Sequence, residues 1–267
     1  MTVTQDEKAV REFSGRADGR ADARADESAD PGRGTDAGRH LDRLVRFMEP
    51  ELDLEDVVLE VPAGNAPVSR AIASRVRHVT ALDPAADLLA EGKRAADHAG
   101  LMNITFARGD AADLPYVDRS FTLVVTRFSL HLAADPEAVV AELARVGRPG
   151  AALIIADRVR PEGLEGDPDR IERLRDPSHA ALLTEARIAE MLAASGAEVK
   201  RTERFDRVCP LDAWLESAGT PEDVAARIRR ELRDELEGGP ATGMRPSMVD
   251  GVLHVTHTCV HHQAIVG

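Results

Sequence analysis

Short apolar runs alternate with amphipathic stretches along the middle of the chain. The runs are rich in Val, Leu, Ile and Ala, and they predict five buried strands, at 57–61, 79–82, 104–107, 123–126 and 153–156. Helical patterns lie between the runs, and Asp83-Pro84 and Asp135-Pro136 mark the openings of two of the helices. Strands that alternate with helices of about 10–15 residues predict a parallel sheet covered by helices.

The segments on either side of this alternation add helices and two more strands. Before the first strand, four apolar residues recur at helical spacing and predict one buried helix face: Leu41, Leu44, Val45 and Met48. After the fifth strand we predict, in order, a helix-rich insertion near 161–175, a helix over 184–195, a strand near 198–205, helices after Pro210 and Pro221, a loop over 238–247, and a final strand over 252–266.

We expect two parts, an N-terminal arm over residues 1–38 and one α/β domain over 39–267. Residues 14–38 are rich in Gly, Ala, Arg and Asp, and an Arg-Ala-Asp triplet recurs at 16–18, 20–22 and 24–26. This composition predicts either a mobile arm or a lid that orders on a ligand. The insertion, about 160–183, and the last helices and strand, 206–267, belong to the α/β domain.

Charge and composition narrow the class of function. The net charge of −13 argues against a protein that binds the phosphate backbone of nucleic acids through a basic face. Two cysteines without metal spacing favour a reducing compartment over a disulfide scaffold. Since no secretory apolar segment begins the chain and no apolar run approaches the roughly 18–20 residues that span a bilayer, we expect a cytoplasmic protein without a membrane span.

The segment from Val57 to Pro67 predicts a strand, a tight turn and the start of a helix, which is where an open α/β sheet holds a nucleotide-like cofactor. Only Gly64 remains of the glycines expected there, because Pro62 and Ala66 occupy two of the positions. Asn65 is a predicted helix cap. If Ala66 is left-handed, it costs about 1–2 kcal/mol, equivalent to about tenfold in affinity.

A longer block carries a family resemblance. Residues 106–116 read Phe-Ala-Arg-Gly-Asp-Ala-Ala-Asp-Leu-Pro-Tyr, and Leu130-His131, Asp135-Pro136 and the segment 142–150 follow. Together they resemble the class I S-adenosylmethionine (SAM)-dependent methyltransferases, in particular the ubiquinone/menaquinone-biosynthesis or type 11 group, over roughly residues 40–205. The resemblance implies a Rossmann-like, doubly wound sheet of seven strands, mostly parallel with an antiparallel last strand, plus a helical insertion or cap.

The resemblance also implies a SAM site. Glu60 closes the first strand, Gly64 lies in the turn, Asp83 would hold the ribose hydroxyls, and Asp110 with Ala111 would receive the adenine. Two of these residues have simpler alternatives as well: Asp83 as a helix cap, and Asp110 as a turn residue.

Three further residues are candidates for the chemistry. Arg127 and His131 follow the fourth strand, where the sulfonium and the acceptor meet in the family. We predict His131 as a base for an acceptor that must lose a proton, and Arg127 as a group that orients an anionic acceptor. His179, in the insertion, is a candidate for substrate binding. His131 and His179 can equally have structural roles in their loops.

Other patterns are weaker. His257, Cys259 and His261 would share one face of the final strand, but residues two apart lie about 6–7 Å apart, so we expect no metal site. Arg158, Arg160 and Arg175 are compatible with an anionic substrate, but we interpret them mainly as solvated surface residues.

Three functions stay open: methyl transfer to a small-molecule acceptor, other small-molecule chemistry such as cyclisation, elimination or hydrolysis on a methyltransferase fold, and a non-catalytic binding role. The insertion and residues 206–250 are expected to form the acceptor pocket, and the sequence indicates neither the acceptor nor the oligomeric state.

Overall fold

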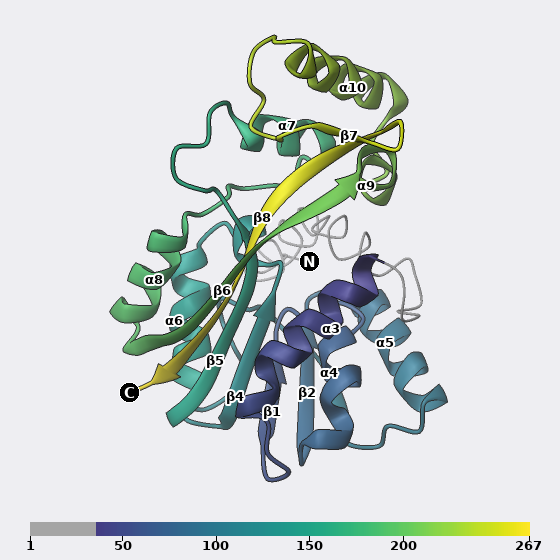
Figure 1. Cartoon of the computed structure of the whole chain (residues 1–267). Coiled ribbons are helices and arrows are strands. Elements are labelled where there is room, and N and C mark those ends of the chain that lie inside the picture. The colour runs from purple at the N-terminus through teal and green to yellow at the C-terminus, as the bar shows by residue number, and fades with distance from the viewer. Residues whose placement is uncertain (1–35) are drawn as a thin grey trace, which may run out of the picture.

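A computed structural model describes residues 36–267 of the chain (Figure 1). The predicted arm, residues 1–38, therefore lies almost entirely outside the described residues. The first described helix, α3 (Asp36–Met48), buries the four apolar residues that predicted it. Within the described residues, no helix combines the length and the apolar character that a membrane crossing requires.

The centre of the molecule is an eight-stranded sheet, in which seven strands follow the order β3-β2-β1-β4-β5-β8-β6 and a short eighth strand, β7 (Ser247–Val249), pairs with β8. The seven are β1 (Val57–Glu60), β2 (His78–Asp83), β3 (Ile104–Arg108), β4 (Phe121–Arg127), β5 (Gly147–Val159), β6 (Ala197–Pro210) and β8 (Val252–Val266). The pairs among β1 to β5 are parallel, and β8 runs antiparallel to both of its neighbours, β5 and β6. The predicted sheet and its antiparallel last strand are confirmed.

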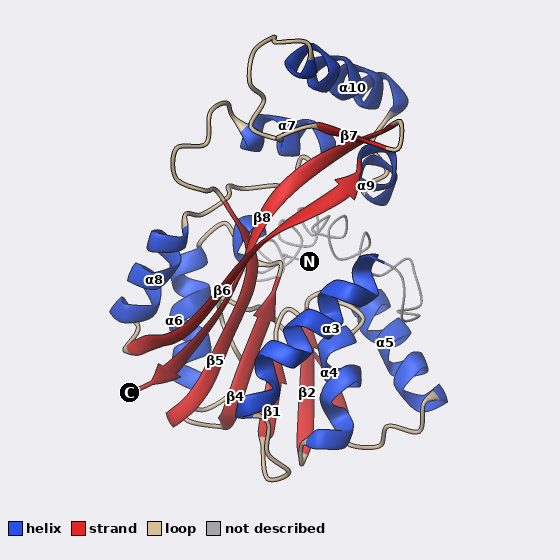
Figure 2. Ribbon diagram, viewed as in Figure 1, coloured by secondary structure: helices blue, strands red, loops and turns tan. Residues whose placement is uncertain are grey.

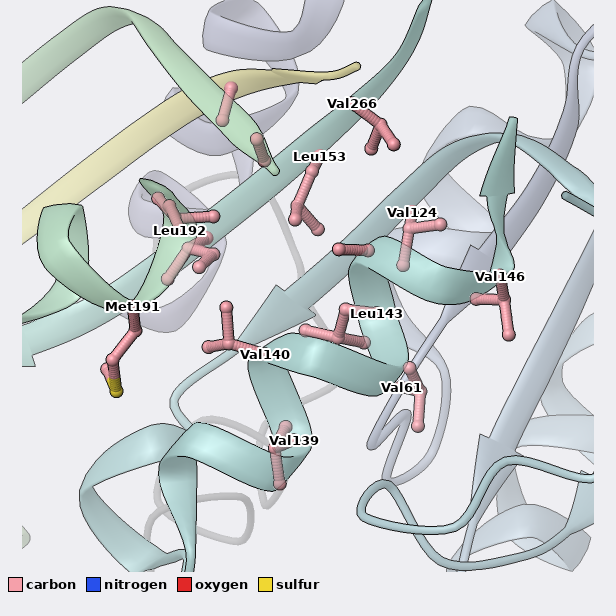
Figure 3. Packing of buried hydrophobic residues seen from close by; sticks show 14 of the residues in the cluster. Val61, Val124, Val139, Val140, Leu143, Val146, Leu153, Met191, Leu192 and Val266 are labelled. Atoms are coloured by element: carbon pink, nitrogen blue, oxygen red, sulfur yellow. The ribbon is translucent and has the colours of Figure 1, made fainter. Parts of the chain in front are cut away.

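Helices cover both faces of this sheet (Figure 2). On one face, α3 and α4 (Pro67–Ile72) pack on the apolar residues of β1, β4 and β5. On the other, α6 (Pro136–Val146) and α8 (Glu185–Ala194) form a second core, in which Val140 and Leu143 lie near Leu153 (Figure 3). The helix α5 (Ala86–His98) contacts β2 and β3. Single 3-10 turns lie at Glu49–Glu51, Ala73–Arg75 and Leu130–Leu132.

A cap lies beyond the carboxyl ends of β5 and β6 (Figure 1). It contains α7 (Pro168–Arg175), α9 (Leu211–Ser217), α10 (Glu222–Leu236), the short strand β7 (Ser247–Val249) and the first half of β8. The cap has an apolar core of its own, which includes Ile171, Trp214 and Ile228. Both β6 and β8 run from the sheet into the cap, so these two strands connect the two cores.

Two expectations about the strands are corrected. The strand predicted near 198–205 is longer and extends over Ala197–Pro210. Exposed residues, several of them charged, alternate with more buried ones along its whole length, as is common at a sheet edge, so the apolar pattern that was used for prediction covers only part of the strand. The predicted loop over 238–247 ends at β7, which pairs with β8 in a hairpin. Its exposed Met248 and Val249 give no alternating pattern from which a strand could be predicted.

Candidate functional site

The loop between β1 and α4 makes a tight turn beside the end of β2. Ala63 donates its backbone N–H to Leu82 O (2.9 Å), and Ala66 donates to Ala63 O (2.7 Å). Gly64 and Ala66 both have left-handed backbones, with φ of 54° and 60°. The condition stated above for Ala66 is therefore met, and the strain for a residue with a Cβ in this conformation is about 1–2 kcal/mol.

Glu60, the last residue of β1, holds this loop through hydrogen bonds to the start of α4. Its carboxylate accepts hydrogen bonds from Val68 N (3.2 Å), from Ser69 N (2.7 Å) and from the Ser69 hydroxyl, so it satisfies amides in the first turn of α4. The predicted cap at Asn65 is wrong, because α4 begins at Pro67 and Glu60 supplies the missing acceptor. Glu60 is thus placed to hold the loop in shape.

Burial raises the pKa of Glu60 to about 7, against the hydrogen bonds from Ser69 and Val68, which lower it. A carboxyl whose pKa is higher in the folded than in the unfolded state stabilises the fold below its unfolded pKa. That contribution is lost as the pH rises through the folded pKa. The unfolding free energy of the native protein should therefore fall, relative to that of Glu60→Gln, by about 2 kcal/mol between about pH 5.5 and about pH 8.5.

Urea denaturation of both proteins across this range measures the difference. The exposed Glu55, replaced by Gln, serves as the control and should give a curve parallel to that of the native protein. Parallel curves for Glu60→Gln as well would show that Glu60 is ionised throughout the range.

Asp83 joins the loop to the end of β2. Its Oδ2 accepts from Gly64 N (2.8 Å) and its Oδ1 from Ala85 N (2.7 Å), and the side chain is buried. Burial raises its pKa, against the two backbone hydrogen bonds. Asp83 does not cap α5, whose N-cap is Ala85. Because each carboxylate oxygen can accept more than one hydrogen bond, Asp83 can still accept from hydroxyl groups of a ligand.

The turn after β3 lies next to Asp83. Gly109 N donates to Asp83 O (3.3 Å), which places Asp110 and Ala111, both half-buried, beside the end of β2. Asp110 Oδ1 accepts from Ala112 N (2.9 Å), so Asp110 has the role of a turn residue. The structure thus brings Gly64, Asp83 and Asp110 to one edge of the sheet.

Sequence reasoning missed Gly92. This residue lies where α5 passes the loop, and a Cβ on it would come within 2.4 Å of Asn65 O. A glycine in the middle of an otherwise helical pattern is the signal that could have indicated such a close approach.

The segment after β4 holds the other candidates. Arg127 ends β4, and Phe128 follows with a left-handed backbone (φ 49°) and donates its N–H to Ala156 O (2.8 Å). Burial and the nearby Arg207 lower the pKa of Arg127 to about 9.

His131 and His179 lie side by side, each on a carboxylate. His131 is completely buried, and its Nδ1 bonds to Asp157, whose other oxygen accepts from Leu130 N (2.7 Å). His179 Nε2 bonds to Asp169 (2.7 Å), and the centroids of the His131 and His179 imidazole rings are 5.9 Å apart.

The insertion lies directly on this site, because Ala180 and Ala181 both donate to His131 O. Asp157 was not among the predicted site residues, since it falls one residue after the predicted end of the fifth strand, which in fact continues to Val159.

The three residues on one face of β8 contact different partners. His261 Nδ1 is 3.2 Å from Glu203, and His257 Nδ1 is 3.7 Å from Glu172. Burial raises the pKa of Cys259 to about 12, so its thiol is protonated. Among residues 36–267, no three His, Cys, Asp or Glu side chains are grouped as metal ligands.

A charged cluster is buried at the base of the cap. Glu172 pairs with Arg158 (2.6 Å) and lies 3.5 Å from Arg175. Arg158 and Arg175 are only 4% and 2% exposed, so interpreting them as solvated surface was wrong. The burial of the two arginines depends on a contact between distant segments, because Glu172, on α7, lies against Arg158 on β5, and sequence alone does not show that contact.

Comparisons with known proteins agree with this geometry. Residues 59–155 match the family described as a methyltransferase domain. An uncharacterized methyltransferase of Bacillus subtilis, YcgJ, is 27% identical over 184 residues, which are 68% of this chain and 73% of YcgJ. The uncharacterized protein YafE of Escherichia coli is 30% identical over 163 residues, 59% of this chain and 77% of YafE.

Solved structures show the same fold. The crystal structure of YcgJ superposes with a TM-score of 0.75 at 23% identity, covering 86% of this chain and 98% of YcgJ. The structure of the [4+2]-cyclase SpnF superposes with a TM-score of 0.62 at 20% identity, covering 85% of this chain and 82% of SpnF.

Proposed function

We propose, from the premise that this chain belongs to the type 11 family of class I SAM-dependent methyltransferases, that it transfers a methyl group from SAM to a small-molecule acceptor. The observation that carries the proposal is the hydrogen bond between Gly64 N and Asp83. It joins the loop after β1 to the carboxylate at the end of β2, where an open α/β sheet holds a nucleotide-like ligand.

The residues at this edge fit SAM in their chemistry. Asp83 would accept from the ribose hydroxyls, and Asp110, with the backbone of Ala111, would receive the adenine. Gly64 lets the backbone approach the ligand closely, because it carries no Cβ. Glu60, with its oxygens on α4, would act indirectly by holding the loop.

SAM supplies an electrophilic methyl group, and the protein positions the acceptor against it. An acceptor hydroxyl or amine that must lose a proton needs a base, and we propose His131 for that role. Asp157 at Nδ1 favours the tautomer that leaves Nε2 able to accept a proton. Since His131 is buried beneath Ala180 and Ala181, this role also requires that loop to admit the acceptor.

A second function is favoured by the turn itself. The left-handed Ala66 and the missing N–H of Pro62 weaken a cofactor loop, and the cyclase SpnF has the same fold. A methyltransferase fold that performs cyclisation, elimination or hydrolysis is therefore the alternative. A product without an added methyl group would support it.

Calorimetric titration with SAM and with S-adenosylhomocysteine tests the proposal. We expect micromolar binding. Asp83→Asn should weaken this binding at least about tenfold, because the ligand loses one charge-assisted hydrogen bond. Ala66→Gly should tighten binding, by up to about tenfold, because it removes a methyl group from a loop whose backbone approaches the ligand closely.

The control is Asp97→Asn, an exposed change on α5 that should leave affinity unchanged. Thermal unfolding of each variant shows whether the fold survives. If neither ligand binds at millimolar concentration to the folded protein or to Ala66→Gly, the methyltransferase proposal fails.

A further inference from the structure

The segment of residues 176–182, which follows α7 in the insertion after β5, lies against His131. Within it, the N–H groups of Ala180 and Ala181 both donate to His131 O at 3.2 Å. His131 is 0% exposed, whereas Ala180 and Ala181 are exposed. A base takes a proton only from a group that comes within hydrogen-bond reach of it, so this segment has to move if His131 is to act on an acceptor.

One carboxylate on α7 holds the segment in place. Asp169 Oδ1 accepts from His179 Nε2 (2.7 Å) and from Leu182 N (2.8 Å). Burial raises the pKa of Asp169, but the bonds from His179 and Leu182 lower it by more, so the net shift is downward and the carboxyl is ionised at neutral pH. Hydrogen bonds to an ionised acceptor are stronger than those between neutral groups. Asp169 is therefore the main attachment of this segment to α7.

Two further contacts shape the segment. Arg173, one helical turn after Asp169 on α7, donates from Nη1 to Ala180 O (3.1 Å). The chain reverses at Asp176, whose Oδ1 accepts from Ser178 N (2.9 Å) in an Asx turn. The segment is thus held on α7 by polar contacts at several points along its length.

Apolar packing and polar satisfaction are both incomplete in this arrangement. Ala180 and Ala181 are exposed, and Leu182 is only half-buried. His179 is 4% exposed, and its Nδ1 is buried with no hydrogen-bond partner among residues 36–267. A buried polar atom without a partner costs free energy, and that cost disappears when water reaches the atom. Segments with few buried apolar contacts are the ones that open locally in folded proteins.

We propose that residues 176–182 form a lid over His131, that Asp169 is the latch of this lid, and that the lid opens to admit the acceptor. This inference rests on the proposed function, in which His131 is the base. Asp169 is a positioning residue, because it acts on the site through His179 and Leu182. When the lid closes again over a bound acceptor, it would keep water away from the methyl group in transfer.

Carbethoxylation of the purified 267-residue chain by diethyl pyrocarbonate tests the lid, with peptide mass spectrometry to follow each histidine separately. The reagent modifies imidazole nitrogens that it can reach, so the rate at His131 reports how often the lid is open. In the native protein we expect His131 to react far more slowly than the exposed His98. Asp169→Asn should raise the rate at His131 roughly tenfold to a hundredfold, because the lid loses hydrogen bonds to a charged acceptor.

A second variant and two controls accompany this measurement. Arg173→Gln removes one bond from the lid and should raise the rate at His131 by a smaller factor, about threefold to tenfold. Arg170→Gln is the matched control on the same helix, because Arg170 pairs with Glu231 on α10 and should leave the rate unchanged. His262, which is 1% exposed and bonds to Thr202, is the control histidine within each sample and should keep its rate.

Amide hydrogen exchange over residues 176–183 provides an independent measurement. The N–H groups of Ala180 and Ala181 donate to His131 and not to Asp169. Faster exchange at these two amides in Asp169→Asn would therefore report opening of the whole lid, beyond the loss of the bonds that Asp169 itself accepts. We expect their exchange to accelerate by the same factor as the carbethoxylation of His131.

The inference is overturned if His131 reacts as fast as His98 in the native protein, or if Asp169→Asn and Arg173→Gln both leave its rate unchanged. A parallel rise at His262 would overturn it as well, because the whole fold would then have loosened. Binding of S-adenosylhomocysteine, measured on the same samples, separates the two proposals. Cofactor binding with an unchanged rate at His131 would remove the lid alone, and a lid that opens as expected without cofactor binding would remove methyl transfer alone.

Discussion

Replacing Glu172 with glutamine is expected to lower the free energy of unfolding by about 3 kcal/mol. Glu172 is 1% exposed, and Arg158 and Arg175 share its carboxylate at distances of 2.6 and 3.5 Å. Two guanidinium groups with side chains 4% and 0% exposed would keep their charge after the carboxylate is neutralised. A buried charge that loses a partner is costly, because the protein interior solvates a charge far less well than water does.

Urea denaturation of the two proteins at neutral pH measures the effect. The control is Glu231→Gln, on α10 near the same helix α7, where Glu231 pairs with Arg170 and Arg227 at the surface. An exposed pair contributes at most about 1 kcal/mol. A loss below 1 kcal/mol for Glu172→Gln as well would mean that the cluster is far better hydrated than its burial indicates.

Gly92→Ala should destabilise the protein, although helix propensity alone predicts the opposite. In an exposed helix interior, Ala is favoured over Gly by about 0.8–1.0 kcal/mol. At Gly92 the new methyl carbon would lie 2.4 Å from Asn65 O and 2.7 Å from Asn65 C, both backbone atoms that no side-chain rotation can move away. Overpacking of this kind costs about 1–3 kcal/mol.

The same change should weaken the binding of S-adenosylhomocysteine roughly tenfold, since the displaced backbone belongs to the loop that carries Gly64. Ala90→Gly, on the exposed side of α5, measures the propensity term in this helix and should cost about 1 kcal/mol without affecting affinity. A Gly92→Ala protein that is more stable than the native one, with native affinity, would contradict the close packing of α5 on the loop.

Local patterns predicted the frame of the molecule well, for a reason that the strands make clear. The core strands β1, β4 and β5 are buried on both faces, so each is a run of apolar residues that stands out in the sequence. Residues at the ends of such strands must come together at one edge, and this is why Gly64, Asp83 and Asp110 could be expected near one another.

Contacts between distant segments could not be predicted in this way. Glu60 was expected to contact the cofactor, but its carboxylate oxygens accept hydrogen bonds from the first turn of α4. Glu60, at the end of β1, thus takes the place of the side-chain cap that was expected for this helix. His131 was predicted as a site residue from its position alone, and its partner Asp157 lies on β5, 26 residues further along the chain. Arg158 was predicted to be solvated, but α7 covers it and Glu172 pairs with it. In each case a residue far along the chain, or in another element, determines the environment.

The position of β8 has a consequence for the order in which the polypeptide can assemble on the ribosome. Within the described residues, β6 pairs with β8 alone, and β8 is made after β6, α9 and α10. While the chain grows, the edge of β5 and the whole of β6 have no strand beside them. Unpaired strand edges favour association with other chains, so this interval is when the nascent protein has the greatest need of a chaperone.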